Sequence, residues 1–305
     1  MTEQAPGLVC LGNFTVDDVY LPDGSVVPQC MGGDALYAAL GARLWETRVQ
    51  LLAPISPDIP ERTLEAMRAT GFDLQHLPIR DVPTIRNRIF YDAQGGRRWE
   101  ILTSEEMFDV LSPRPDDIPE HYLDAQAFLV LAMTLDSQER LIEWLRQHTR
   151  AILALDTQED YVRGNETRIL DLACQVNVFM PSAVEAVQLL GHRDWIRAAW
   201  EFAEMGPQVV VIKCGEEGVM IVNRETGEWI HQKPESGKVI DPTGAGDAFC
   251  GGFLATYLQN PYDLQRAARA GSISASFALA SYGMDALLAA KPEDALLRLH
   301  EYHRS

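Results

Sequence analysis

Short apolar runs alternate with helical stretches along most of this chain, and this alternation constrains the fold more than any other feature. A short apolar run is typical of a strand that is buried on both faces, and a helical stretch between two such runs connects parallel strands. The pattern therefore predicts an α/β fold, with a doubly wound, mostly parallel sheet flanked by helices. The expected strands are 7–12, 49–54, 127–133, 151–156, 176–180 and 208–214, and the expected helices are 34–45, 61–70, 137–149, 166–174, 183–190, 194–205, 245–258, 262–281 and 292–302.

Two segments, 19–31 and 84–102, break this alternation and look like antiparallel β material. In the second segment, the residues Gln94-Gly95-Gly96 form a favourable hairpin turn between two runs of strand character. A small sheet attached to a doubly wound core suggests a lid over a binding cleft. We therefore predict a single domain over residues 1–305, with lid insertions at about 14–31 and 84–102.

The charge balance restricts the partners of this protein. Its 305 residues include 44 acidic and 26 basic residues, for a net charge of −18, and no run of Lys and Arg forms a local basic patch. Such a surface repels nucleic-acid backbones and anionic membranes. The apolar runs are too short to span a bilayer, and the first residues have no secretion-signal pattern. We expect a cytoplasmic protein that binds neither nucleic acid nor membrane.

The segment 239–253, with the sequence V-I-D-P-T-G-A-G-D-A-F-C-G-G-F, is the most informative part of the chain. A glycine-rich turn that opens into a helix leaves backbone N–H groups free at the positive end of the helix, and small residues let a phosphate approach them. A carboxylate at Asp247 would repel that anion, unless it accepts a proton beside a transferring phosphoryl group. The alternative is an ordinary helix start capped by Thr243, which leaves Gly244 and Gly246 unexplained because glycine weakens a first turn.

This segment resembles the second signature of the PfkB, or ribokinase-like, carbohydrate kinase family, whose core is D-T-x-G-A-G-D; Pro242 is the one departure. Three other segments agree with the resemblance. Residues 31–41 are similar to the first signature, in which two glycines precede a helix. Residues 12–17 are similar to the strand end that supplies a sugar-binding Asp, and residues 211–218 to the strand and turn beside the nucleotide. The resemblance covers about residues 8–283.

The resemblance implies a ribokinase-like fold and an ATP-dependent kinase that phosphorylates a hydroxyl group of a sugar or sugar-like small molecule. It also implies Mg²⁺ and, as in some relatives, K⁺. Relatives often dimerise through the lid sheet, so a homodimer is a further expectation. Asp247 would be the general base, and the backbone of Gly244, Ala245 and Gly246 would be the anion hole for the γ-phosphate.

The resemblance also assigns binding roles to residues of this chain. Glu185 would organise water around Mg²⁺, and Asp241 would help to hold a monovalent cation. The expected substrate-binding residues are Asn13, Thr15, Asp17, Gly32, Gly33, Tyr37 and Arg97, and the expected nucleotide-binding residues are Lys213, Gly215, Gly218, Thr243 and Ser276.

Several residues bear on the substrate. Tyr37 stands where many sugar-kinase relatives have Asn, and Ser182 replaces the Asn of the family's N-x-x-E motif. Arg86 and Arg88 are at strand spacing, so both point to one face. In the cleft they would suit an acidic or phosphorylated sugar, and on the other face they would be solvated.

Three alternatives differ in function. A nucleoside kinase of the same family would use the same chemistry, with aromatic residues of the lid, such as Phe90 and Trp99, available for stacking. A Rossmann-type NAD-dependent oxidoreductase is a remote alternative, because residues 244–249 partly match G-x-G-x-x-G; however, Phe249 takes the place of the third glycine. An inactive relative that only binds its ligand would have no evident need for Asp247.

Overall fold

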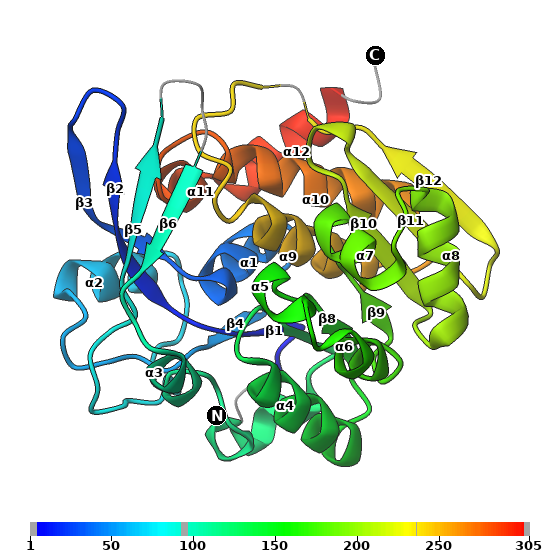
Figure 1. The fold of residues 1–305 in the computed structure, drawn as a ribbon, viewed down its shortest axis with the longest axis horizontal. Helices are drawn as coiled ribbons and strands as arrows, with labels where there is room; N and C mark the ends of the chain where they lie inside the picture. Colours follow the sequence, from blue (N-terminus) through cyan, green and yellow to red (C-terminus); the bar gives the residue numbers. More distant parts are fainter. Residues whose placement is uncertain (1–4, 93–96, 236, 302–305) are drawn as a thin grey trace.

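The computed structural model describes residues 5–92, 97–235 and 237–301, and these form two sheets with helices packed around the larger one (Figure 1). The large sheet consists of β1 (Leu8–Leu11), β4 (Val49–Leu52), β7 (Ala127–Val130), β8 (Ile152–Leu155), β9 (Val178–Phe179), β10 (Val209–Lys213), β11 (Val219–Asn223) and β12 (Glu228–Gln232). The small sheet consists of β2 (Thr15–Tyr20), β3 (Val26–Gly32), β5 (Asn87–Tyr91) and β6 (Arg97–Ile101).

The large sheet has the strand order β12-β11-β10-β9-β8-β7-β1-β4, and its strands from β4 to β10 are parallel. This arrangement confirms the doubly wound, mostly parallel sheet that the sequence predicts. The last two strands, β11 and β12, are antiparallel and were not assigned from the sequence. The Thr226-Gly227 turn between two apolar-rich runs was the signal for this hairpin.

Helices cover both faces of the large sheet. The α-helices of the described ranges are α1 (Asp34–Arg43), α2 (Glu61–Ala69), α3 (Glu105–Val110), α4 (Leu135–His148), α5 (Glu159–Val162), α6 (Glu166–Ala173), α7 (Ala183–Leu190), α8 (Trp195–Met205), α9 (Ala245–Tyr257), α10 (Leu264–Ala278), α11 (Asp285–Ala289) and α12 (Pro292–Glu301). One hydrophobic core lies between the sheet and α1, α9 and α10, and a second lies between the sheet and α4, α6 and α8. The expected C-terminal helix ends at Tyr302, which lies outside the described residues.

The small sheet has the order β3-β2-β5-β6 and stands at one side of the large sheet (Figure 1). Its β2–β3 and β5–β6 pairs are antiparallel, as expected, whereas the central β2–β5 pair is parallel. The predicted turn at 94–96 lies outside the described residues. Among the helices of the described ranges, none is both long and apolar enough to cross a membrane.

Helices α1 and α9 pack unusually closely, because small residues line both sides of their contact. A Cβ atom added to Gly251 of α9 would lie 1.9 Å from the carbonyl oxygen of Ala38. One added to Gly41 of α1 would lie 2.3 Å from the carbonyl oxygen of Ala248. The backbones of the two helices are therefore in direct contact, and neither position can accept a side chain without a shift of the helices.

This contact predicts that Gly251→Ala destabilises the fold. The added methyl group would overlap the Ala38 carbonyl, and overpacking of this kind costs about 1–3 kcal/mol. Urea unfolding followed by circular dichroism measures the loss. Gly237→Ala is the control, because no atom lies within 4 Å of its added Cβ. Equal unfolding midpoints for the two variants would contradict the packing argument.

Candidate active site

The glycine-rich turn enters α9 as the sequence predicts. Gly244 precedes the helix with φ 73°, a left-handed conformation that favours glycine, and an added Cβ would lie 2.3 Å from the Tyr37 ring. The next residues, Ala245 and Gly246, form the first turn of α9. The Ala245 N–H donates a long hydrogen bond of 3.4 Å to the Pro242 carbonyl, and the bond between the Ala248 N–H and the Gly244 carbonyl, at 2.9 Å, is the first of the regular helical pattern. The turn therefore has the backbone geometry of an anion-binding helix start.

Asp247 lies in this first turn. The residue is partly exposed to solvent. Burial and the negative charge of Asp156 raise the pKa of Asp247 to about 6, while the positive charge of Lys213 opposes the shift. Asp247 is therefore a stronger base than an ordinary aspartate.

Lys213 and Asp156 form a buried ion pair beneath the turn. They stand at the carboxyl ends of β10 and β8, and the Lys213 Nζ atom is 2.5 Å from both Asp156 carboxylate oxygens. Their side chains are only 14% and 4% exposed. The Cys250 Sγ atom, on the next turn of α9, is 3.6 Å from Nζ. Asp156 thus holds the ammonium group that we expected at the nucleotide phosphates, and the role of Lys213 in nucleotide binding stays a prediction.

Glu185 is fixed at the start of α7 by a reciprocal cap. Its Oε2 atom accepts hydrogen bonds from the Ser182 N–H at 2.7 Å and the Thr157 hydroxyl at 3.1 Å. The Ser182 hydroxyl in turn accepts a hydrogen bond from the Glu185 N–H at 3.2 Å. Burial and the charge of Asp156 raise the pKa of Glu185 to about 7, while Lys213 opposes the shift. Ser182, the departure from the family's Asn, therefore acts as the helix cap.

Asp17 belongs to β2 of the small sheet, and each of its two carboxylate oxygens accepts a hydrogen bond. Its Oδ2 accepts a hydrogen bond from the Thr15 hydroxyl at 2.8 Å, and its Oδ1 from the Asn87 amide at 2.9 Å. Burial raises the pKa of Asp17 to about 6. Gly32 lies against this carboxylate, because an added Cβ would be 2.4 Å from Oδ2. The predicted residues Thr15, Asp17 and Gly32 therefore come together.

Gly33 and Tyr37 connect this group to the anion-binding turn. An added Cβ on Gly33 would lie 2.5 Å from the Asn13 carbonyl oxygen, so the glycine allows the loop between β1 and β2 to lie on the start of α1. Tyr37 is buried, and burial together with the charges of Asp241, Asp17 and Asp247 raises its pKa. The Tyr37 ring lies directly against Gly244, because an added Cβ on that glycine would be 2.3 Å from the ring.

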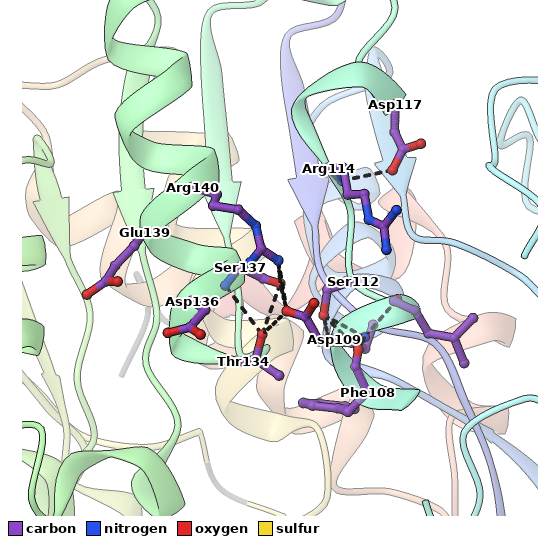
Figure 2. Close-up of polar contacts among 12 residues, drawn as sticks. Phe108, Asp109, Ser112, Arg114, Asp117, Thr134, Asp136, Ser137, Glu139 and Arg140 are labelled. Atoms are coloured by element: carbon purple, nitrogen blue, oxygen red, sulfur yellow. Dashed lines mark hydrogen bonds and ion pairs between the residues drawn. The ribbon is translucent and has the colours of Figure 1, made fainter. Parts of the chain in front are cut away.

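Asn13 faces another part of the structure. Its amide group donates a hydrogen bond to the Leu111 carbonyl at 2.8 Å and another to the Ser112 hydroxyl at 3.3 Å, just after α3. The α3 helix is itself anchored to α4 by Asp109 (Figure 2). The Asp109 carboxylate accepts hydrogen bonds from Thr134, Ser137 and Arg140 at 2.7–2.8 Å. Asn13 thus clamps the chain before β2 to the chain after β6, and its role as a substrate ligand stays a prediction.

Asp241 lies at the entrance to the turn and is 1% exposed. Its carboxylate accepts hydrogen bonds from the Thr243 N–H at 2.8 Å, from the Gly283 N–H at 3.3 Å and from the hydroxyl of Tyr91. Tyr91 belongs to β5 of the small sheet. The sequence analysis missed Tyr91 and Asn87, although the period-2 alternation of β5 buries both on one face.

The remaining predicted residues lie around this centre. Gly215 and Gly218 bound the turn between β10 and β11. The Ser276 hydroxyl donates to the Ile273 carbonyl and accepts a hydrogen bond from Arg298 at 2.6 Å. The side chain of Arg97 lies outside the described residues.

Arg86, just before β5, and Arg88, within β5, are both solvated. Arg86 pairs with Asp58 at 3.7 Å, and Arg88 pairs with Glu100 at 3.5 Å. All four side chains are more than a third exposed, so neither pair is a buried anion reader.

The described side chains can be tested for a metal. Across the described ranges, no group of three or more His, Cys, Asp or Glu side chains has the arrangement of a metal cage. The negative charge of Asp156 acts on both Glu185 and Asp247, and the positive charge of one lysine, Lys213, acts on the same two carboxyl groups. This excess of carboxylate fits Mg²⁺, which binds through one or two carboxylates and keeps several waters.

The chain resembles known proteins in sequence and in fold. The sequence matches the pfkB family carbohydrate kinase domain over residues 14–290. It is 30% identical over 255 residues to the cytidine kinase of Thermococcus kodakarensis, covering 82% of this chain and 88% of that protein. The nucleoside kinase of Burkholderia thailandensis, solved with inosine, has the same fold with a TM-score of 0.81 and 18% identity, covering 97% of both chains. A structure assigned as Ribokinase II from E. coli, solved with ATP and Mg²⁺, has a TM-score of 0.79 and 17% identity, covering 97% of this chain and 99% of that one.

The buried ion pair predicts the effect of Lys213→Met on stability. Removal of the ammonium group leaves the Asp156 carboxylate buried without its partner, which typically costs about 3–5 kcal/mol. Urea unfolding measures the loss. The matched variant Lys213→Met/Asp156→Asn removes both charges and should recover part of it. The single variant Asp156→Asn completes the comparison. If the double variant loses as much free energy of unfolding as the two single variants together, the two groups do not interact.

Proposed function

The chain belongs to the pfkB family of carbohydrate kinases, and on this basis we propose that it transfers the γ-phosphate of ATP to a hydroxyl group of a sugar or sugar-like small molecule. The observation that carries the proposal is the position of Asp247, a carboxylate with a raised pKa, in the first turn of α9, directly after a glycine-rich turn that no side chain caps. A proton acceptor beside an anion site is what phosphoryl transfer to a hydroxyl needs. Family membership also removes the argument for an NAD-dependent oxidoreductase.

In the proposed reaction, the γ-phosphate lies against the N–H groups of Gly244, Ala245 and Gly246. Asp247 takes the proton of the acceptor hydroxyl while the oxygen of that hydroxyl attacks the γ-phosphorus. The bond from that phosphorus to the bridging oxygen breaks, and ADP leaves. Because the turn is held in place before the reaction, its N–H groups stabilise the charge on the phosphoryl oxygens without reorganisation.

The other side chains bind and orient in this proposal. Asp17, held by Thr15 and Asn87, accepts hydrogen bonds from the other hydroxyl groups of the acceptor. Glu185 holds Mg²⁺ through water; the ion supplies positive charge that neutralises the phosphates. Lys213 balances the charge of Asp156 beneath the turn. The small sheet acts as a lid that excludes water from the cleft.

A nucleoside is the second candidate for the acceptor. It is favoured by the cytidine kinase of Thermococcus kodakarensis, to which the chain is 30% identical over 82% of its length. A nucleoside contains a ribose, so the proposed roles of Asp17 and Asp247 are the same for both acceptors. Tyr37, in place of the family's Asn, removes an amide from the site and argues against simple ribose or fructose.

The proposal predicts that Asp247→Asn abolishes the transfer. Asn has nearly the same shape but accepts no proton, so kcat should fall by about 10²–10⁴-fold. ADP release in the presence of an acceptor measures the rate, and calorimetric titration with ATP should show that nucleotide binding is retained. Turnover at the wild-type rate would contradict the assignment of the base.

The pH profile tests the ionised state that this role requires; Asp17, with a pKa of about 6, and Glu185, with a pKa of about 7, titrate in the same range, so the profile is compared with that of Asp247→Asn. Asp247 accepts a proton only when ionised, and its pKa is about 6. The wild-type kcat/KM should therefore fall about tenfold per pH unit below pH 6 and level off above it. A profile that stays flat down to pH 4.5, near the ordinary pKa of an aspartate, would contradict this role.

The acceptor is identified by a screen of sugars, sugar acids, polyols and nucleosides for ADP release that depends on the acceptor. If the acceptor is a nucleoside, the kcat/KM for cytidine should exceed that for ribose by at least about tenfold, because base contacts add binding energy to the shared ribose contacts. A kcat/KM for ribose that exceeds the values for all the nucleosides in the screen would exclude the nucleoside candidate. Release of ADP that no acceptor stimulates would contradict the proposed reaction itself.

A further inference from the structure

The carboxylate of Asp241 stands where the family resemblance implies a monovalent cation. In this structure, hydrogen-bond donors surround it. Its Oδ1 accepts hydrogen bonds from the Thr243 N–H and the Tyr91 hydroxyl, and its Oδ2 accepts one from the Gly283 N–H. The three donors come from the anion-binding turn, the small sheet and the loop after α10.

These residues do not fit a cation on Asp241. A cation such as K⁺ is bound by several oxygen atoms whose negative ends face it. Around Asp241, two N–H groups and one O–H group instead point their positive ends at the carboxylate. A cation placed there would be repelled by these groups, which take up three of the roughly four lone-pair sites of the carboxylate. The buried charge of Asp241 already has the partners that it needs.

Tyr91 is held in this position by the docking of the small sheet. Val19, Ile89 and Tyr91 form a separate buried cluster against Tyr282 of the loop after α10. The rings of Tyr91 and Tyr282 meet edge to face at 5.4 Å. This loop also supplies the Gly283 N–H, so the same contact presents both donors to Asp241.

Asp241 in turn acts on the anion-binding turn. Its Oδ1 accepts the hydrogen bond of the Thr243 N–H, and Gly244, the next residue, leads into α9. The Tyr91 hydroxyl is also 3.3 Å from the Thr243 hydroxyl. A donor on Asp241 therefore fixes the backbone just before the N–H groups that would receive the phosphate.

We propose that Tyr91 is a positioning residue that takes the place of a monovalent cation, so that docking of the small sheet orders the anion-binding turn. This inference rests on the proposed phosphoryl transfer. With the Tyr91 hydroxyl on Asp241, the reaction does not need K⁺. The order of the turn then depends on the docking of the small sheet, which also binds the acceptor. The acceptor-binding sheet and the phosphate-binding turn are then ordered by the same contact.

The test compares wild type, Tyr91→Phe and the control Tyr20→Phe in KCl, NaCl and tetramethylammonium chloride at one ionic strength. Tyr20 is a tyrosine of the same sheet whose ring stacks on Phe90 at 4.6 Å, away from Asp241. The readouts are kcat and KM for the acceptor found by the screen, and the melting temperature without ligands. The substitution removes only one hydroxyl group, so all three proteins should fold.

We expect wild type and Tyr20→Phe to have the same kcat in all three salts. Tyr91→Phe should lose roughly tenfold to hundredfold in kcat in tetramethylammonium, since a hydrogen bond to a charged group is lost. K⁺ should restore part of that loss, because one oxygen of Asp241 then has room for a cation. The KM for the acceptor should change much less than kcat, because Tyr91 acts on the turn.

Three results would overturn the inference: activation of wild type by K⁺, a wild-type kcat for Tyr91→Phe, or a loss in Tyr91→Phe that K⁺ leaves unchanged. The melting temperatures separate this inference from the proposed reaction. A cation that binds the wild-type protein would raise its melting temperature by several degrees, whether or not an acceptor is found. Equal melting temperatures in the three salts are expected. A complete absence of ADP release in every salt would count against the reaction alone.

Discussion

The direct backbone contact between α1 and α9 is the constraint on which the site depends. Gly41 and Gly251 leave no room for side chains, so the two helices lie against each other on one face of the large sheet. Their N-termini then meet at the carboxyl edge of the parallel strands, where ligands bind in open α/β sheets. Gly33 leads into α1 and Gly244 into α9. The acceptor side and the phosphate side of the candidate site are thus the starts of two packed helices.

This position has an electrostatic cost, because carboxylates gather where protein atoms exclude water. Burial raises the pKa values of Asp17, Asp247 and Glu185, and Asp156 raises the last two further. Lys213 opposes both shifts through its charge. The lysine therefore limits how far the base is shifted. Without it, Asp247 would be protonated over more of the neutral pH range and less able to accept a proton.

The sequence predicted the parts of the structure that depend on local pattern. The parallel strands, most helices and the turn at Gly244 follow from hydrophobic periodicity and from glycine at a helix start. The partners of the site residues were not predicted, because they come from distant segments. Asp156 is 57 residues from Lys213, and Tyr91 is 150 residues from Asp241. Such pairs depend on the strand order, and a single sequence does not specify that order.

The small sheet shows how one strand can serve both halves of the site. Asn87 and Tyr91 are four residues apart in β5, so they share a face and lie roughly 13 Å apart along the strand. The first reaches Asp17, the proposed acceptor ligand, and the second reaches Asp241, beside the anion-binding turn. A shift of β5 by one residue would turn both side chains to the opposite face. The register that positions Asn87 against the proposed acceptor ligand therefore also positions the Tyr91 hydroxyl beside the glycine-rich turn.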